Sequence, residues 1–349
     1  MSFLCCFCCI PVTTKYWVRE EDLPEVLLRS ASELPVLVYG KTGLLTKNPG
    51  NPSEGSREDF WESLASPISS VYFDSDGLDV YAERLKRSEG AQLFRVRWYG
   101  DRQPAADATV FLELKTHHEC WIDNPSVKER VALKQFRMNE LIDVSDGPWD
   151  RDRAGVLVAE AISSAAAQEE VNTATELLLE IRRLFCKLKL KPCVRTSYIR
   201  AAFQSPDNND LRLTIDRDIT VIDERRAYED RRKNGGSSWC IGDNDVVPIG
   251  AFIKVPYSVF EVKVAGNENP PFVERLLKSD AIVETSKFSK FLTGVSLHNV
   301  NEVVSFSRKK AHSGLRSNLF STCVCSNRRK RYLGGPKTKC LRQCFKKRS

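Results

Sequence analysis

The sequence contains no uninterrupted apolar run of about 20 residues, the length that a helix needs to cross a bilayer. It also contains no internal repeat of the kind that marks solenoid folds. Histidine is scarce, and the four residues, His117, His118, His298 and His312, form no convincing metal-binding cluster. We expect His117 to act as a hydrogen-bonding residue. At 349 residues the chain can still bury a sizeable core, in one large domain or two.

Cysteine is sparse in the body of the chain, although the whole sequence has 12. The body holds only Cys120, Cys186, Cys193 and Cys240, whose scatter gives no disulfide framework. We therefore expect a reducing compartment.

The first 12 residues, MSFLCCFCCIPV, lack the positive segment and cleavage site of a signal peptide, and no glycine follows Met1 for myristoylation. Several acyl chains here would give a stable membrane anchor. The candidate S-acylation (palmitoylation) sites are Cys5, Cys6, Cys8 and Cys9. Two alternatives to S-acylation are a small metal site formed by these cysteines and a disordered, hydrophobic end of the chain.

Acidic residues are absent from the last part of the chain. Residues 308–349 contain fourteen Lys or Arg and no Asp or Glu, so the tail carries +14, the whole chain +7 and the body −7. Residues 306–349 are expected to form a disordered tail. Its cysteines, Cys323, Cys325, Cys340 and Cys344, alternate with basic clusters, which favours an anionic membrane surface as partner over emerging polyphosphate or nucleic acid.

Four segments alternate apolar and charged residues with the period of a strand. They are Val110–Lys115, Phe94–Trp98, Leu211–Asp218 and Phe260–Val264. The simplest interpretation is an antiparallel sheet with one buried face and one solvent-exposed face. However, Arg or Lys repeatedly shares the charged face with a carboxylate. If such strands closed into a barrel with these faces inward, the lumen would be a basic tunnel suited to a polyanion and a divalent metal.

Other patterns predict the remaining elements. Strands are expected at 13–18, 70–74, 195–204 and 211–222, with a last strand at 260–264. Helices are expected at 20–34, 79–87, 127–144, 163–190 and 270–278, and loops at 47–59 and 225–245. Arg130 and Lys134 are then expected to be helix-surface charges. Asp216 and Asp218 are expected to orient lumen arginines or to assist a metal, and Glu261 and Lys263 could simply pair with each other.

Nine blocks, in this order, resemble the catalytic domain of the vacuolar transporter chaperone (VTC) family of polyphosphate polymerases, over roughly 13–295. They are Thr14–Val18, Ser70–Asp74, Phe94–Gly100, Glu113–His117, Ser126–Arg130, Tyr198–Phe203, Asp216–Asp218, Phe260–Lys263 and Lys287–Lys290.

The resemblance implies an α+β fold of the triphosphate tunnel metalloenzyme superfamily, a closed antiparallel β-barrel with flanking helices, spanning 13–305. It implies transfer of the γ-phosphate of ATP onto a growing inorganic polyphosphate. Tyr198 and Ser289 would bind substrate through their hydroxyls, and Glu261 would hold Mn²⁺ or Mg²⁺. The catalytic, phosphate-binding positions would be Lys15, Arg95, Arg97, Lys115, Lys128, Arg200, Arg212, Lys287 and Lys290.

Catalytic subunits of this family usually also carry an SPX domain and transmembrane helices, and this sequence shows neither. We therefore expect a peripheral protein on the cytosolic face of a vacuolar or acidocalcisome-type membrane, with other VTC-complex subunits as partners and nucleic acid not among them. Two other functions stay open: a catalytically silent, polyphosphate-binding subunit, and a tunnel enzyme that hydrolyses triphosphate.

Overall fold

A computed structural model describes residues 11–40, 43–47, 65–100, 103–118, 126–206, 210–233, 238–242, 250–265, 268–285 and 288–298. The predicted Cys-rich segment, apart from its last two residues, and the basic tail therefore lie outside the described residues. So do Lys287 and most of the predicted loop at 47–59.

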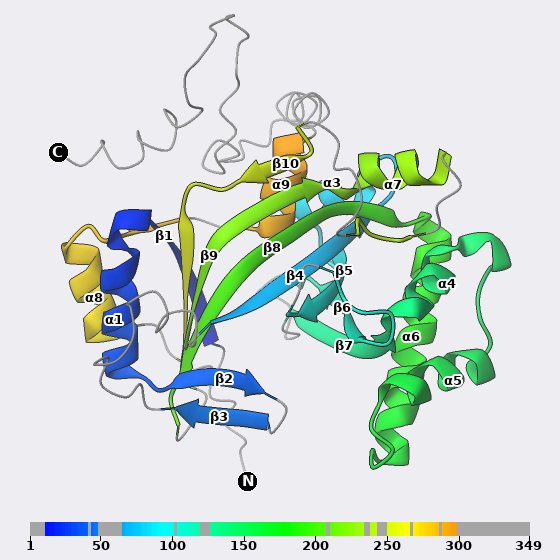
Figure 1. Cartoon of the computed structure of the whole chain (residues 1–349), viewed down its shortest axis with the longest axis horizontal. Coiled ribbons are helices and arrows are strands. Elements are labelled where there is room, and N and C mark those ends of the chain that lie inside the picture. The colour runs from blue at the N-terminus through cyan, green and yellow to red at the C-terminus, as the bar shows by residue number, and fades with distance from the viewer. Residues whose placement is uncertain are drawn as a thin grey trace, which may run out of the picture.

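The centre of the fold is one antiparallel sheet of 12 strands (Figure 1). Its main path runs β12 (Ile282–Glu284), β1 (Pro11–Val18), β11 (Ser258–Ala265), β9 (Leu211–Asp223), β8 (Lys191–Gln204), β4 (Ala65–Asp74), β5 (Gln92–Tyr99), β6 (Thr109–Thr116) and β7 (Val127–Lys134). Off this path, β10 (Phe252–Lys254) pairs with β9, while β2 (Val36–Gly40) pairs with both β8 and β3 (Gly43–Lys47). The predicted antiparallel sheet with flanking helices is confirmed.

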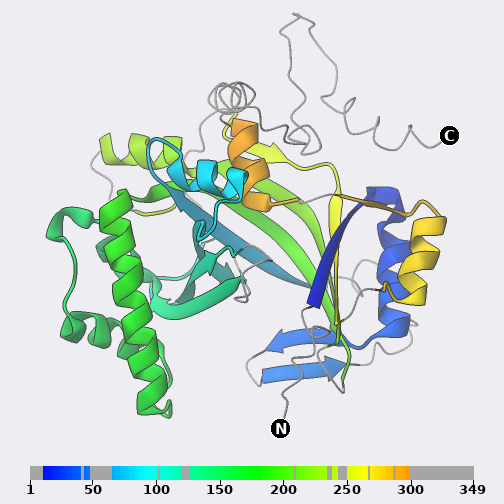
Figure 2. The same cartoon turned by 180° about the vertical axis from the view of Figure 1, so that it is seen from behind.

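The predicted closure of this sheet into a barrel is wrong. Figure 2 shows the sheet bent around an interior, with β5–β7 on one side and β1 and β11 on the other. Within the described ranges, β7 and β12 end the path and do not pair with each other. Closure needs a hydrogen-bonded ladder between the two edges. With three residues, β12 offers too short an edge, and β7 instead lies against α5 (Arg151–Ala161) and α6 (Gln168–Leu188).

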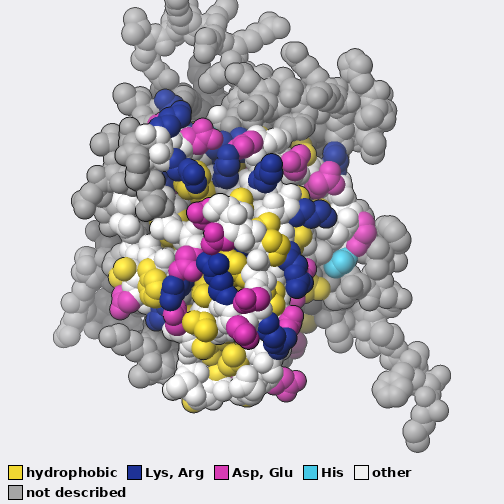
Figure 3. Space-filling model, turned by 90° about the vertical axis from the view of Figure 1, so that its right-hand side faces the viewer, with side chains coloured by type: hydrophobic (Ala, Val, Ile, Leu, Met, Phe, Trp, Pro, Cys, Tyr) yellow, Lys and Arg dark blue, Asp and Glu magenta, His cyan; other side chains and the backbone are white. Residues whose placement is uncertain are grey.

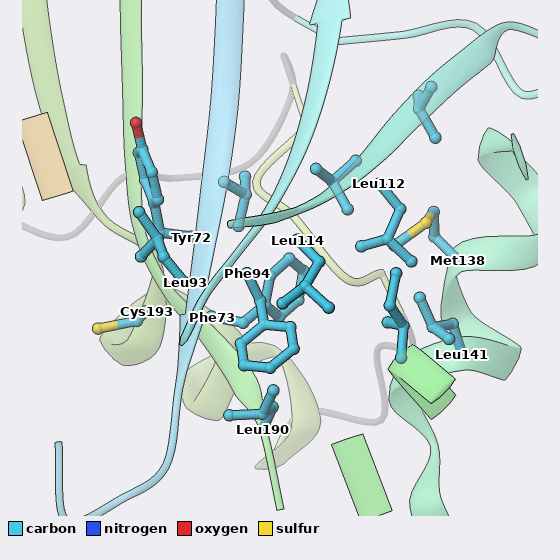
Figure 4. Packing of buried hydrophobic residues seen from close by; sticks show 14 of the residues in the cluster. Tyr72, Phe73, Leu93, Phe94, Leu112, Leu114, Met138, Leu141, Leu190 and Cys193 are labelled. Carbon is cyan, nitrogen blue, oxygen red and sulfur yellow. The ribbon is translucent and has the colours of Figure 1, made fainter. Parts of the chain in front are cut away.

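The apolar face of the sheet is its outer face. Phe94, Leu112 and Leu114 are 0–1% exposed. Figure 4 shows Leu112 beside Met138 of α4 (Met138–Ile142), and the Phe94 ring near Leu190. The Phe94 ring also meets the ring of Phe185 on α6 edge-on, with 5.9 Å between centroids. Because side chains alternate along a strand, burying these residues turns their charged neighbours to the concave side.

A second apolar cluster covers the other end of the sheet. Tyr16, Phe260 and Val262 of β1 and β11 pack there with Val26 of α1 (Leu23–Glu33) and Phe272 of α8 (Pro271–Lys278). The two clusters together leave the concave face of the sheet as the place for its charged side chains.

The predicted strands at 13–18, 70–74, 195–204, 211–222 and 260–264 all lie within observed strands. The predicted helices at 20–34, 79–87, 163–190 and 270–278 correspond to η2 (Glu20–Asp22) with α1, to α3 (Asp79–Lys86), to α6 and to α8.

Two predictions of secondary structure are wrong. Residues 127–144 form strand β7, then η3 (Gln135–Arg137) and α4, followed by η4 (Val144–Asp146), instead of one helix. Val131 and Leu133 are buried at a spacing of two, which marks the strand. Residues 225–245 were expected to be a loop, but they begin with α7 (Glu224–Lys233). The sequence of α7 is mostly polar, and its buried apolar residues are only Ala227 and Tyr228, too few to show a helical period. Helices α5 and α9 (Lys290–His298) were not predicted.

The face that carries α4, α5 and α6 has interspersed basic and acidic side chains (Figure 3). Ion pairs such as Arg137–Glu160 and Arg153–Glu140 cover it. In the part of the chain described, no helix is long and apolar enough to cross a membrane.

Candidate functional site: a basic cavity on the concave face

Strands β5, β6 and β7 build the first group of charged side chains. Alternation places Arg95 and Arg97 of β5 on the concave face, opposite the buried Phe94 and Val96. The register pairs Arg95 with Glu113 of β6, and Lys115 with Lys128 of β7. Arg95 forms an ion pair with the fully buried Glu113, and Lys128 Nζ lies 2.8 Å from the other carboxylate oxygen. We call Arg95, Glu113, Lys115 and Lys128 the Glu113 cluster.

This cluster has more positive than negative charge. Burial opposes ionisation of Glu113, but Arg95, Arg97 and Lys128 outweigh it and lower the pKa of the carboxyl to about 2. The pKa of Lys115 falls well below its ordinary value because the Arg95 guanidinium repels the ammonium and burial desolvates it. Among the described residues, no carboxylate forms an ion pair with Lys115. An anion that entered would remove this repulsion.

Arg97 is held by neutral groups. Its Nη2 donates to the Tyr198 hydroxyl at 3.1 Å and its Nε to Ser70 Oγ at 3.2 Å. Tyr198 lies on β8 where the register with β9 shifts, between Ser197 and Ile199. Two hydroxyl contacts fix the guanidinium without neutralising it, so its positive charge remains available to a ligand.

A second group joins the sheet to α9. Asp216 of β9 accepts two hydrogen bonds from Arg200 of β8, at 2.5 and 2.8 Å, and also pairs with Lys290 at the start of α9. The Lys290 ammonium lies 4.5 Å from the centroid of the Tyr198 ring. Burial alone would raise the pKa of Asp216, but Arg200 and Lys290 lower it, so the carboxylate stays charged. We call Arg200, Asp216 and Lys290 the Asp216 cluster.

Glu261 is the third inward carboxylate. Its register partner on β1 is Lys15, whose Nζ lies 3.8 Å from Glu261 Oε2 and donates to the Phe288 carbonyl at 2.8 Å. Lys263 Nζ lies 3.4 Å from Glu261 Oε1, so the predicted pairing of these two residues is present. Burial opposes ionisation, yet Lys15 and Lys263 lower the pKa of Glu261.

The described residues include no group of three or more His, Cys, Asp or Glu side chains that could hold a metal by itself. Glu261 fits a different arrangement, since its lysine contacts, at 3.4 and 3.8 Å, are looser than those of Glu113 and Asp216. One carboxylate suffices for Mg²⁺ when phosphate oxygens and water complete the ligand shell.

The cations of these groups and Glu261 line one cavity of about 880 Å³, whereas Glu113 and Asp216 are not among its wall residues. Every predicted site residue that the structure describes contributes to its wall: Lys15, Arg95, Arg97, Lys115, Lys128, Tyr198, Arg200, Arg212, Glu261, Ser289 and Lys290. Ser289 Oγ also accepts from Leu292 N at 3.4 Å, in the first turn of α9. The structure thus brings these side chains together, and their roles stay predictions.

The cavity also has wall residues that sequence reasoning missed or misplaced. Arg130 was expected on a helix surface, but it follows Lys128 at a spacing of two on strand β7 and lines the cavity. Lys134 lies outside it and donates to the Asp107 carbonyl. The additional wall residues include Tyr72, Arg84, Arg87, Tyr99 and Lys263. Of these, Lys263 could have been found, because it alternates with Glu261.

His117 also lines the cavity, and its Nδ1 lies 3.4 Å from Ser126 Oγ, as expected of a hydrogen-bonding residue. The two aspartates separate. Asp216 orients Arg200, as one of the predicted alternatives has it, whereas Asp218 pairs with Arg217 and Lys254 away from the cavity wall. The cavity wall therefore combines many fixed cations with two carboxylates, Glu261 and Glu284, while Glu113 and Asp216 hold wall cations without lining the cavity themselves. This charge pattern suits a chain of phosphates.

Comparison with known proteins gives consistent matches. The family model for the VTC domain matches residues 12–299. The vacuolar transporter chaperone complex subunit 4 of Schizosaccharomyces pombe is 32% identical over 298 residues, covering 81% of this chain and 37% of that protein. Subunit 4 of Trypanosoma brucei brucei is 33% identical over 296 residues, covering 81% and 34%. Subunit 2 of Schizosaccharomyces pombe is 26% identical, covering 82% and 37%.

The chain thus spans about a third of the length of these curated relatives. Among solved structures, a putative adenylyl cyclase from Hippeastrum, described with a dominant triphosphatase activity, has a TM-score of 0.35 at 13% identity, covering 82% of this chain and 96% of that chain. A similarity of that size is too weak to add to the description of the fold.

Proposed function

The chain belongs to the VTC domain family, and from that premise we propose that it is a polyphosphate polymerase that transfers the γ-phosphate of ATP onto a growing inorganic polyphosphate. One observation carries the proposal. Strands β1, β5, β6, β7, β8 and β9 and helix α9 all direct Lys or Arg into the same cavity, and the buried carboxylates Glu113 and Asp216 each hold only two of these cations. The surplus positive charge suits a polyanion.

Phosphoryl transfer asks little covalent chemistry of a protein, because positioning and charge neutralisation supply most of the catalysis. In this proposal Arg95, Arg97 and Lys115 hold the oxygens of the transferred phosphate. Arg200 and Lys290 align the end of the acceptor chain. A terminal phosphate oxygen of the acceptor attacks the γ-phosphorus, the bond from that phosphorus to the bridging oxygen breaks, and ADP leaves with the electron pair.

The acceptor is itself the nucleophile, so the reaction needs no Ser-His-Asp or Cys-His arrangement. The fixed guanidiniums act as the preorganised charges that stabilise the transition state. Tyr198 and Ser289 add hydroxyl contacts to substrate. Glu261 would hold Mn²⁺ or Mg²⁺, which when bound neutralises charge on the phosphate oxygens.

The test is incubation of the purified chain with ATP and Mn²⁺, with separate readouts for long polymer and free orthophosphate. We expect polymer, and we expect Lys115→Ala to reduce its formation strongly while Lys134→Ala, a cation outside the cavity, does not. Orthophosphate without polymer would identify a triphosphatase. Tight polyphosphate binding without turnover would identify a silent accessory subunit.

We also propose that the chain works with other VTC-complex subunits, because its relatives are named as subunits of that complex. The proposed place is the cytosolic face of a vacuolar or acidocalcisome-type membrane. S-acylation at Cys5, Cys6, Cys8 and Cys9 and attraction of the basic tail to anionic lipid would hold it there. Release from membranes after hydroxylamine, which cleaves thioesters, tests the anchor.

A further inference from the structure

One end of the cavity wall is aromatic as well as basic. Tyr99 follows Arg97 at a spacing of two on β5, and Phe111 of β6 is the register partner of Arg97. The rings of Tyr99 and Phe111 meet edge-on, with centroids 5.9 Å apart. The Arg130 guanidinium lies over Phe111, 4.4 Å from its centroid. Tyr99, Phe111 and Arg130 form what we call the aromatic rim.

The aromatic rim lies at the open side of the cavity. Tyr99 is 41% exposed, whereas Arg95 and Arg97 on the same face of the same strand are each 7% exposed. Both Tyr99 and Arg130 belong to the cavity wall. Burial opposes ionisation of Tyr99, but the nearby Arg97 and Arg130 guanidiniums lower the pKa of its hydroxyl. The exposed ring thus lies beside cations that are expected to bind phosphate.

The spacing fits a ligand with one planar end and one anionic end. Residues two apart on a strand are separated by about 7 Å, so Tyr99 is about 7 Å from Arg97 and about 13 Å from Arg95 along the strand. A nucleoside triphosphate has this form: the ribose separates its base from the phosphates by a similar length. Inorganic triphosphate has no planar group to stack on the Tyr99 ring.

We propose that the aromatic rim is the subsite for the purine base of a nucleoside triphosphate, with the base stacked on the Tyr99 ring and flanked by Arg130. The proposal rests on the proposed function and assigns the donor end of the cavity. Aromatic rings and guanidinium planes both stack on bases, and a purine offers the larger face. Phe111 supports Arg130 from below and is a positioning residue.

The experiment compares the affinities of ATP and inorganic tripolyphosphate, measured by calorimetry at one fixed salt concentration without metal. For Tyr99→Ala we expect a roughly tenfold loss of ATP affinity, a size typical of one lost stacking contact. Tripolyphosphate affinity should be unchanged, which also shows that the variant is folded. Tyr99→Phe keeps the ring and should retain most of the ATP affinity.

Phe136→Ala is the matched control. Phe136 is 47% exposed and lies under Arg137 at 4.9 Å, the same kind of contact, but it is not part of the cavity wall. It should change neither affinity. If Tyr99→Ala leaves ATP affinity unchanged, or weakens both ligands equally, the base subsite is overturned while the proposed function stands. If the wild-type chain binds neither ligand, both proposals fail.

Discussion

The two halves of the cavity each have a buried carboxylate that holds cations, but the two arrangements differ in their remaining charge and in the elements that they join. In both the Glu113 cluster and the Asp216 cluster, one buried carboxylate holds two cations. The Glu113 cluster is built only from neighbouring strands and retains an additional cation, Lys115. The Asp216 cluster has no additional cation and instead ties β8 and β9 to α9. We infer that the first half mainly attracts phosphate and the second half mainly fixes the wall.

Loss of the central carboxylate should affect the Glu113 cluster most. Glu113→Gln leaves Arg95 next to Lys115 without a countercharge, and we expect a loss of about 3 kcal/mol in the free energy of unfolding, measured with urea at pH 7. Glu140→Gln is the control, because Glu140 also contacts two arginines, Arg137 and Arg153, on the outer face but is one-third exposed. It should cost about 1 kcal/mol or less. Equal losses in the two variants would contradict the account.

The corresponding change in the other half should be local. Asp216→Asn removes the charge that holds Lys290, and we expect about 2 kcal/mol of destabilisation with faster amide hydrogen exchange in α9. The apolar contacts of Phe291 and Val295 keep the helix in place. Exchange in β5 and β6 should not change. If α9 exchanges at the wild-type rate, Asp216 does not fasten it.

The third carboxylate should affect metal dependence. Glu261→Gln is expected to raise the Mn²⁺ concentration needed for half-maximal polymer formation by about tenfold, because a neutral amide is a poorer ligand for a hard cation. Glu229→Gln, on the exposed side of α7, should leave the metal dependence unchanged. An unchanged requirement for Mn²⁺ in Glu261→Gln would place the metal elsewhere.

In the protein without a bound anion, Lys115 should lower the free energy of unfolding. Its lowered pKa means that the ammonium form destabilises the folded protein at neutral pH. This penalty begins to fall as the pH rises through the lowered pKa and is gone above the ordinary lysine pKa of about 10.4. Lys115→Met should therefore raise the free energy of unfolding at pH 7 by about 1 kcal/mol and the Tm by about 2 °C. The gain should shrink at alkaline pH. A variant that is less stable than wild type at pH 7 would contradict this.

The smallest expected effect is the pH dependence that Lys115 gives to tripolyphosphate affinity. Between pH 7.5 and 9.5 the phosphate chain loses no negative charge, while Lys115 begins to lose its proton below the ordinary lysine value of about 10.4. Tripolyphosphate affinity should fall a few-fold over this range. Lys115→Arg, whose charge persists, should flatten the dependence. A wild-type affinity that is independent of pH would show that Lys115 stays charged throughout.

The charged face was predictable from the sequence because it depends on a local rule. Alternation in Phe94–Trp98 or Phe260–Val264 decides which side chains share a face, and burial of Phe94 and Phe260 decides which face is outward. The resemblance then placed residues of distant segments, such as Lys15 of β1 and Lys290 of α9, in one site. Their meeting depends on strand order, which no local pattern contains.

The errors came from longer-range features. The apolar residues of 127–144 suit a helical period as well as a strand, so Arg130 was assigned to the wrong kind of surface. Whether the sheet closes depends on its two edges, β7 and β12, which lie about 150 residues apart in the sequence. The aromatic rim was missed because Tyr99 and Phe111 meet only through the register of β5 and β6.

The central claim is that the concave cavity holds a chain of phosphates, and a calorimetric titration with tripolyphosphate tests it most directly. We predict a single site whose affinity falls as salt is raised, and which Lys115→Ala weakens by about thirtyfold or more while Lys134→Ala leaves it unchanged. Binding that is absent from the wild-type chain, or equal in the two variants, would contradict the claim.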